Sequence, residues 1–347
     1  MRGKAGGVTR RMRADCAKDR AEPSELFRLA PAPQVASNGV EWLSVPNWKR
    51  SRWLWHGFST RRGGLSRAYC PDDAPGELSK LGELNLGFTA ADNRETVAEN
   101  RRLLAEAITG SRDTPLIPVR QIHSSVVRFA GSSGGACAQP GRSEPTRFEP
   151  SKFEPSKGDG LMTNTPGLLL AVQTADCIPV LVADRRQRVV AAFHAGWRGT
   201  VKRIVESGVG RMRLDYGCRS QDMMAAIGPG IGACCYAVGD EVFSSFESQF
   251  TYFADLFCEV YDSDPVRTKY PMLFLTQRAP GHSPIGPNLH LDLVEANRRQ
   301  LLAAGLSARS IKVVGGCTSC QRELFFSHRA SKGHAGRMMA VIGIRPE

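Results

Sequence analysis

The feature that most limits how this chain can fold is a group of three apolar runs that follow one another closely. Each run is five residues long and carries no charged side chain, which is the length of a β-strand rather than of a helix. Runs of this kind predict strands that are buried within a sheet. The runs are residues 168–172, 178–182 and 189–193.

Helical patterns and further short strands surround these runs. Asp92 precedes the first helical pattern as a possible N-cap, and Gly305 follows the last one at a position where glycine often ends a helix. Because helices and strands mix without a regular βαβ repeat, we expect an α+β fold, a single domain of mixed β-sheets layered with helices. The predicted helices are residues 92–108, 200–209, 240–250 and 291–304, and the further strands are residues 225–227, 311–314 and 338–342.

Composition divides the chain into a leader and one domain. Residues 1–38 are rich in Arg, Ala and Pro without hydrophobic periodicity, so we predict a disordered basic leader that lacks the apolar segment of a secretory signal. We expect residues 39–347 to form the single folded domain. We predict two surface insertions in it, at about 131–157, which ends in a repeated Phe-Glu-Pro-Ser-Lys unit, and at about 262–288, which contains five prolines.

The net charge and the cysteine content limit which partners this protein is expected to bind and in which compartment it is expected to be. The formal net charge of +12 would attract anions such as phosphate, but the basic residues are scattered and no nucleic-acid-binding motif is present. No apolar run approaches the length of a membrane span. Ten cysteines at irregular spacing indicate free thiols in a reducing cytoplasm. We therefore expect a cytoplasmic protein, a monomer or weak homodimer, without nucleic-acid or membrane partners.

Two residues at the predicted strand ends could carry chemistry. Cys177 precedes the second apolar run, and His194 follows the third and is itself followed by a turn at Gly196 and Gly199. Rigid strands that end beside loops often hold functional side chains. Taken alone, however, a cysteine beside an apolar strand is more often inert core.

A longer pattern around His194 is specific to a protein family. Residues 191–199, Ala-Ala-Phe-His-Ala-Gly-Trp-Arg-Gly, closely resemble the signature of the YfiH-type laccase-domain family, also called multicopper polyphenol oxidases and peptidoglycan editing factors. The other blocks of that family occur here in the same order over residues 40–345. They are residues 56–61, 84–87, 120–123, 159–164, 174–179, 227–231, 291–293, 317–318 and 325–329.

The resemblance implies an α/β sandwich of mixed sheets with one zinc site formed by His123, Cys177 and His194. It also implies phosphorolysis of adenosine, inosine or methylthioadenosine and deamination of adenosine, so the partners would be a nucleoside and phosphate. The residue chemistry agrees, because two imidazoles and a thiolate suit Zn²⁺ and three protein ligands leave a fourth position open.

Further site residues are expected from their places in the family blocks. Asp176 adjoins Cys177 and would be a general base, a partner of a ligand histidine or a simple cap. Arg61 and Arg198 are candidates for binding phosphate, because a guanidinium matches its geometry.

The sequence assigns no firm role to two further residue groups. His328 stands where the family commonly has tyrosine, and a surface hydrogen-bonding role is favoured over acid–base chemistry. Cys317 and Cys320 have the CxxC spacing of a redox pair or of half a zinc site, but no second CxxC follows. A structural pair of thiols is the preferred interpretation.

Two other functions remain as alternatives. A copper polyphenol oxidase would need paired His-x-His ligands, and no two of the seven histidines are separated by one residue. A cysteine-type amidase acting on peptidoglycan precursors would use Cys177 as nucleophile with His194 or His123 as base. The zinc base-deaminase signature is absent, so any deamination would use a different fold.

Overall fold

The computed structural model describes residues 30–70, 82–131, 156–260 and 288–347. Most of the predicted leader and nearly all of both predicted insertions lie outside the described residues. Among the described residues, no helix combines the length and the apolar character that crossing a membrane requires.

The three apolar runs form strands that belong to two different sheets. The first run lies in β9 (Leu169–Thr174), whereas the other two form β10 (Ile178–Asp184) and β11 (Val189–Ala195). The chain therefore crosses from one sheet to the other between Thr174 and Ile178. His194 lies inside β11 rather than after its end, because β11 continues through Ala195.

The first sheet has six strands in the order β1-β2-β3-β17-β9-β6. Its strands pair antiparallel except for β6 and β9, which are parallel. The strands added here are β1 (Gln34–Val35), β2 (Glu41–Leu43), β3 (Leu54–Ser59), β6 (Leu116–Pro118) and β17 (Met338–Ile344).

The second sheet also has six strands, in the order β16-β12-β10-β11-β8-β7. Its parallel pairs are β12 with β16 and β7 with β8. The two mixed sheets, with helices outside them, confirm the predicted α+β class. The strands added here are β7 (Val127–Phe129), β8 (Gly160–Thr163), β12 (Met223–Ile227) and β16 (Ile311–Val313).

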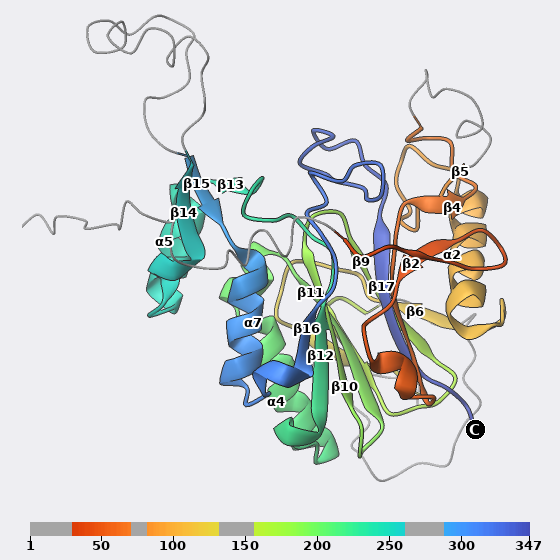
Figure 1. Ribbon diagram of the computed structural model, residues 1–347, viewed down its shortest axis with the longest axis horizontal. Coiled ribbons are helices and arrows are strands. Elements are labelled where there is room, and N and C mark those ends of the chain that lie inside the picture. The colour runs from red at the N-terminus through yellow and green to blue at the C-terminus, as the bar shows by residue number, and fades with distance from the viewer. Residues whose placement is uncertain (1–29, 71–81, 132–155, 261–287) are drawn as a thin grey trace, which may run out of the picture.

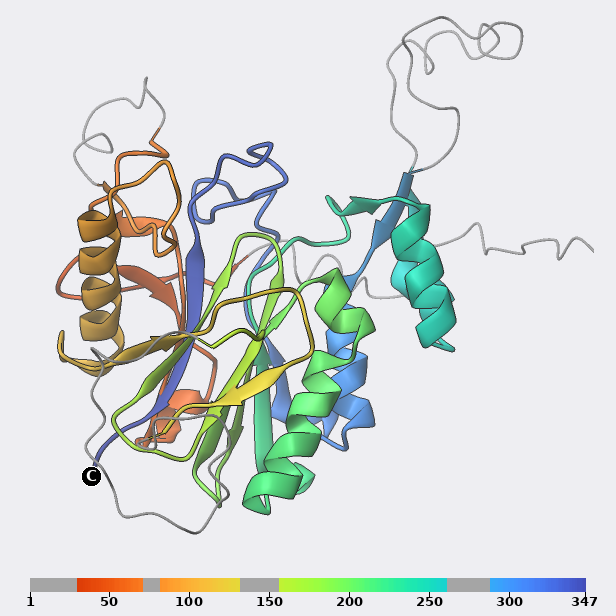
Figure 2. The same cartoon turned by 180° about the vertical axis from the view of Figure 1, so that it is seen from behind.

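The sheets pack face to face, and alternation along β10 shows how each face is covered. Leu181 and Ala183 point into the core between the sheets, while Val180 and Val182 belong to the core beneath the helices. Successive side chains of a strand point to opposite faces, so an uninterrupted apolar run serves both cores. The helices α4 (Ile204–Tyr216) and α7 (Leu293–Ala303) cover this outer face (Figures 1 and 2).

The opposite outer face, on the first sheet, is covered by α2 (Arg94–Thr109). Asn93, not Asp92, is its N-cap, and the Asn93 side chain accepts backbone hydrogen bonds from Glu95 and Thr96. The Asp92 carboxylate accepts instead from Ser66 and Asn85. The predicted cap was wrong by one residue because Asp92 is occupied by these tertiary contacts.

The other predicted helices differ from the structure mainly at their starts. Residues 200–209 divide into α3 (Trp197–Val201) and α4, separated by Arg203 in a left-handed conformation with φ 57°. Leu291 ends β15 (Asn288–Leu291), and α7 begins after the cap Asp292. Gly305 has φ +92° directly after the Ala304 C-cap, which confirms the predicted end.

Smaller elements extend both ends of this framework. A three-stranded sheet of order β13-β15-β14 lies with α5 beside the sandwich (Figure 1), and β4 pairs with β5. Their bounds, with those of the short 3-10 helices, are β4 (Arg62–Gly64), β5 (Gly82–Glu83), β13 (Ala237–Val238), α5 (Asp240–Gln249), β14 (Phe257–Val260), η1 (Trp48–Arg50), η4 (Ser220–Asp222), η5 (Phe253–Leu256) and η7 (Ala308–Ser310).

The end of the predicted leader and the end of the predicted first insertion differ in the structure. Gln34 and Val35 form β1, with Gln34 opposite Trp42, so ordered pairing begins before residue 39. The backbone carbonyl of Ser156 accepts a hydrogen bond from Arg120. The last residues of the predicted first insertion therefore belong to the domain.

Candidate metal centre

His123, Cys177 and His194, the ligand set that the family resemblance implies, lie close together in the structure. Their ligand atoms all lie within 4.8 Å of one another. The two imidazole rings meet edge to face, with centroids 5.1 Å apart. His123 lies between β6 and β7, and Cys177 lies between β9 and β10, so both come from links that pass from one sheet to the other. The cluster therefore lies where the chain crosses from one sheet to the other.

The lack of a side chain at Gly196 leaves room for the Cys177 sulfur. His194 is paired with Pro179 across β10 and β11, which places Gly196 near Cys177. A Cβ at Gly196 would lie 2.8 Å from the Cys177 Sγ and 3.5 Å from the His123 ring. The glycine of the His-Ala-Gly-Trp block is therefore required by close packing against two of the three candidate ligands.

Asp159 is the functional residue that the sequence analysis did not single out. Its carboxylate accepts from His194 Nδ1 at 2.9 Å and from the backbone N–H groups of Ile122, His123 and Ser124 at 3.2, 3.0 and 2.6 Å. Asp159 is fully buried. It orients the His194 ring through Nδ1 and fixes the loop that carries His123. Its place in one of the family blocks, directly before β8, was the available signal.

The charged forms of Cys177, His194 and Asp159 stabilise one another. Burial alone would raise the pKa of the Cys177 thiol, but His194 and then His123 outweigh it and lower that pKa to about 6. Burial likewise opposes charge on His194, yet Cys177 and Asp159 raise its pKa to about 9. Hydrogen bonds from His194 and Ser124 overcome burial and lower the pKa of Asp159 to about 2. Without a metal, the site favours a thiolate beside an imidazolium.

Asp176 holds the Cys177 link in place. Its φ of 93° is unusual for a residue other than glycine. One carboxylate oxygen accepts from the Thr318 hydroxyl at 2.6 Å, and the other accepts from the backbone N–H of Arg329 at 2.6 Å. Both Asp176 oxygens thus accept hydrogen bonds from protein donors. The carboxylate that accepts from His194 belongs to Asp159, so Asp176 does not take this role, which was one of those left open for it.

Arg61 is held by the protein itself. Its guanidinium donates to the Glu83 carboxylate and to the carbonyl oxygens of Arg322 and Tyr69, and it lies over the Phe326 ring. These contacts use most of its donors. They give Arg61 a visible role in joining the N-terminal strands to the C-terminal loop.

Arg198 is differently placed. It lies in α3, four residues after His194, with its guanidinium over the Trp197 ring and 3.9 Å from Glu241. The side chains of Arg198 and Glu241 are 53% and 76% exposed, so this ion pair is weak. Arg198 therefore keeps donors available to a ligand.

Tyr236 and Arg329 also adjoin the centre. Burial and then the charge of Cys177 raise the pKa of Tyr236 to about 12, so its hydroxyl stays protonated. The Arg329 guanidinium lies 5.2 Å from the Tyr236 ring and donates to the Ala237 carbonyl. Neither residue was predicted as part of the site. His328 is exposed, next to Arg329.

The predicted pair Cys317 and Cys320 is not alone. Cys234 and Cys235 lie beside it, and the four sulfur atoms are within 4.8 Å of one another. The CxxC pattern was visible in the sequence, but its partners are more than 80 residues earlier in the chain. Only the fold brings the two halves together.

The residues of the His123 cluster fit a zinc ion. Two imidazoles and a thiolate are a ligand set that zinc accepts, and three protein ligands are the number found in catalytic sites. The hydrogen bond from His194 Nδ1 to a buried carboxylate is the usual support of a metal-binding histidine. Among the described residues, the His-rich clusters of a multicopper centre are not found.

The fold and the cluster together define a two-sheet α/β sandwich with a candidate metal centre at the crossing of the sheets. Residues 55–345 match the family model described as multi-copper polyphenol oxidoreductase laccase, and the chain belongs to this family. The resemblance seen in the sequence is thereby confirmed.

Individual relatives agree with this assignment. The chain is 33% identical over 298 residues to the purine nucleoside phosphorylase YlmD of Geobacillus stearothermophilus, covering 84% of this chain and 90% of that protein. It is 34% identical over 184 residues to the adenosine deaminase RL5 of an unknown prokaryotic organism, covering 53% of this chain and 61% of that one. The crystal structure of the Bacillus licheniformis hypothetical protein YfiH superposes with a TM-score of 0.68 at 28% identity, covering 90% of this chain and 99% of that one.

Proposed function

We propose that this protein is a zinc-dependent purine nucleoside phosphorylase that also deaminates adenosine. The observation that carries the proposal is the convergence of His123, Cys177 and His194, with His194 oriented by the buried carboxylate of Asp159. The names of the relatives, a purine nucleoside phosphorylase and an adenosine deaminase, support the two activities. Adenosine, inosine and methylthioadenosine are the proposed nucleosides, with phosphate as co-substrate.

The proposed roles follow from the contacts of each residue. His123, Cys177 and His194 would hold the zinc ion, which supplies either a water of pKa about 7 or an electrophile that orients phosphate. Arg198, exposed and weakly paired, would bind phosphate. Asp176 would position Cys177 rather than act as a base, because both of its oxygens accept protein hydrogen bonds. Arg61 would act indirectly, through the loop at Arg322.

A cytoplasmic location is part of the proposal. Ten cysteines at irregular spacing suit a reducing compartment, in which thiols stay reduced. The proposed partners are small molecules.

One incubation separates the activities. Purified protein loaded with zinc is incubated with adenosine, with and without phosphate, and the products are resolved by chromatography. Phosphate-dependent adenine and ribose-1-phosphate indicate phosphorolysis, and inosine indicates deamination. His194→Ala should lose both activities, while the surface variant Asp215→Asn should keep them. Zinc-loaded wild-type protein that converts neither adenosine nor inosine would refute the proposal.

A second candidate, the cysteine-type amidase, is favoured by one observation, the lowered pKa of Cys177 beside His194. The two functions differ in what they require of Cys177. A carboxylate can ligate zinc but cannot replace a thiolate nucleophile. Cys177→Asp should therefore keep a measurable rate on adenosine, and chelation should abolish wild-type activity reversibly. A covalent acyl adduct on Cys177 in active, metal-free protein would support the amidase instead.

A further inference from the structure

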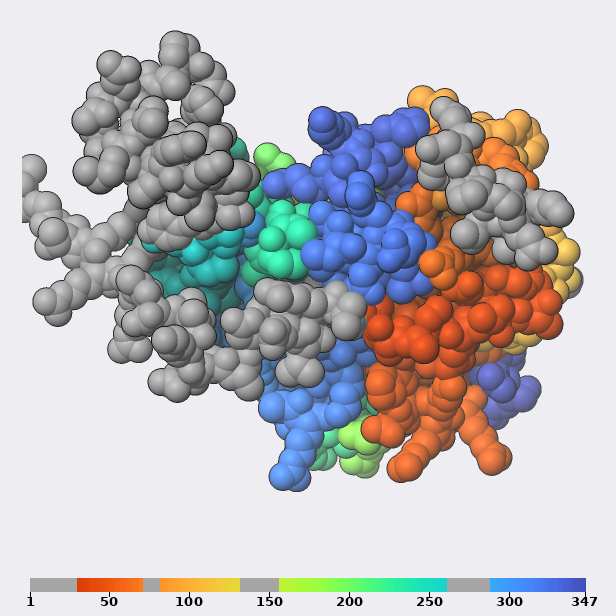
Figure 3. Space-filling model, turned by 45° about the horizontal axis from the view of Figure 1, so that its top comes forward, coloured from red at the N-terminus to blue at the C-terminus, as the bar shows by residue number. Residues whose placement is uncertain are grey.

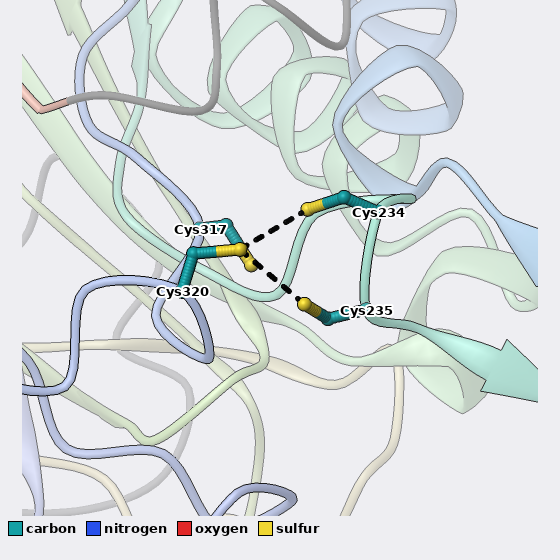
Figure 4. Close-up of side chains that lie close together, drawn as sticks. All are labelled: Cys234, Cys235, Cys317 and Cys320. Atoms are coloured by element: carbon teal, nitrogen blue, oxygen red, sulfur yellow. Dashed lines mark hydrogen bonds between the residues drawn. The ribbon is translucent and has the colours of Figure 1, made fainter. Parts of the chain in front are cut away.

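Two loops that are distant in sequence bring four cysteines together outside the His123 centre. Cys234 and Cys235 precede β13, and Cys317 and Cys320 follow β16. Figure 4 shows the four side chains pointing toward a common point between the loops. Their sulfur atoms all lie within 4.8 Å of one another. Cys317 is buried and Cys320 is exposed, so the cluster is open to solvent on one side.

The distances within the cluster match a metal site better than a disulfide. Cys320 Sγ lies 3.6 Å from Cys234 Sγ and 3.4 Å from Cys235 Sγ. A disulfide needs about 2.05 Å. Four sulfurs around a tetrahedral zinc ion, each about 2.3 Å from it, would be about 3.8 Å apart. The two measured sulfur–sulfur distances are therefore close to the spacing in a zinc site and too long for a disulfide bond.

Backbone hydrogen bonds hold the two loops in register. Thr318 donates to the Gly230 carbonyl at 3.0 Å, and Cys235 donates to the Gly232 carbonyl at 3.0 Å. The Gly232 N–H donates to the Cys317 sulfur at 3.3 Å. The Cys317 sulfur thus lies beside a backbone N–H group. The thiolate is the form of cysteine that ligates metals.

We propose that Cys234, Cys235, Cys317 and Cys320 bind a second zinc ion in a closed, four-thiolate site. Four protein sulfurs fill a tetrahedral shell and leave no position for substrate, which is the arrangement of a structural zinc. Binding releases the remaining thiol protons to solvent. This proposal goes beyond the pair of structural thiols that the sequence favours for Cys317 and Cys320.

The position of this site links it to the His123 centre. Thr318, next to Cys317, donates to Asp176, which adjoins Cys177. In Figure 3 the C-terminal part of the chain, in blue, lies between the orange N-terminal surface and the green middle of the chain. The second zinc ion would hold the two cysteine-bearing loops together beside the His123 centre.

Metal content tests the proposal without reference to activity. Wild-type protein is purified under reducing conditions with added zinc and no chelator, and its metals are counted by elemental analysis. We expect two zinc ions in the wild type, one in His123→Ala/His194→Ala, and one in Cys320→Ser. Cys70→Ser, which removes a thiol outside both clusters, should keep two. Circular dichroism checks that each variant is folded.

Cobalt gives a reading that does not depend on the cysteine variants. In folded His123→Ala/His194→Ala protein, Co²⁺ should show the strong sulfur-to-metal charge-transfer bands and visible d–d bands of a tetrahedral four-thiolate site. A single zinc ion in the wild type that Cys320→Ser retains, no metal in the double histidine variant, or two zinc ions retained in Cys320→Ser would overturn the proposal. So would iron in place of zinc, or a cluster disulfide detected by intact mass in the reduced preparation.

Discussion

At the scale of single residues, Asp159 joins the two candidate histidine ligands. It accepts the Nδ1 hydrogen of His194 and the backbone N–H of His123 with the same oxygen. Its second oxygen accepts from Ser124. The position of two ligands therefore depends on one buried carboxylate. This dependence makes Asp159 the most informative single substitution.

Asp159→Asn should weaken zinc binding at the His123 centre by about 10- to 100-fold, the usual cost of losing a supporting carboxylate. The amide keeps one oxygen acceptor but loses the charge that favours the His194 orientation. Competition with a chromophoric chelator measures the affinity, and Asp215→Asn, which weakens a half-buried ion pair with Arg211 away from the cluster, is the control. Unchanged zinc affinity in Asp159→Asn would show that the hydrogen bond is incidental.

Cys177 should be unusually reactive in protein stripped of metal. Only the thiolate is alkylated, so the rate of iodoacetamide reaction should fall as the pH drops through about 6. An ordinary thiol loses its reactivity below about 8.5. His194→Ala removes the cation that stabilises the thiolate and should move the midpoint to higher pH. Peptide mapping measures Cys177.

Cys70 provides the internal comparison for that titration. Burial and then the charge of Glu83 raise the pKa of the Cys70 thiol. Its alkylation should therefore lag behind that of Cys177 at every pH below neutrality. A Cys177 midpoint at or above that of Cys70 would contradict the assigned thiolate–imidazolium pair.

At the scale of elements, the packing of α4 on β11 decides where His194 lies. Gly208 of α4 faces Phe193, the residue before His194, and a Cβ there would come within 2.3 Å of the Phe193 ring. Gly210 of the same helix has nothing within 4 Å of an added Cβ. The two glycines therefore differ only in what they pack against.

Gly208→Ala and Gly210→Ala should have opposite effects on stability. Overpacking against Phe193 should cost about 1–3 kcal/mol in the free energy of unfolding. Alanine at position 210, in a helical conformation, should stabilise by about 0.4–1 kcal/mol. Urea unfolding measures both, and zinc affinity should fall in Gly208→Ala alone. Equal effects of the two substitutions would exclude close packing of α4 on β11.

At the scale of the whole molecule, the core between the two sheets holds the metal centre together. His123 and Cys177 lie on the links that cross from one sheet to the other, so sliding of the sheets would separate the candidate ligands. Leu181 of β10 is fully buried in this core, whereas Leu214 of α4 is 83% exposed.

Leu181→Ala should therefore lower the free energy of unfolding by about 2–5 kcal/mol through the lost transfer energy and the cavity. Leu214→Ala, the same chemical change at the surface, should stay within about 0.5 kcal/mol of the wild type. Thermal and urea unfolding measure both variants. A small effect at Leu181 would mean that the sheets do not pack as the structure shows.

Much of this molecule could be predicted from the sequence because the relevant signals are local. Uninterrupted apolar runs mark strands covered on both faces, as in β10 and β11. Gly305 marks the end of α7 because its positive φ suits glycine. The candidate ligands His123, Cys177 and His194 were expected from the family blocks around them, and the structure places them close together.

The remaining features depend on contacts between distant residues, for which a single sequence carries no local signal. The partner of His194 is Asp159 rather than Asp176, because the chain crossing between the sheets turns Asp176 toward Thr318 and Arg329. The four-cysteine cluster exists only because two loops more than 80 residues apart meet. The sequence alone indicated where most of the longer strands and helices lie and which residue types could bind a metal. The tertiary structure alone decided which of those residues meet, because loop closure over long distances depends on how the two sheets pack.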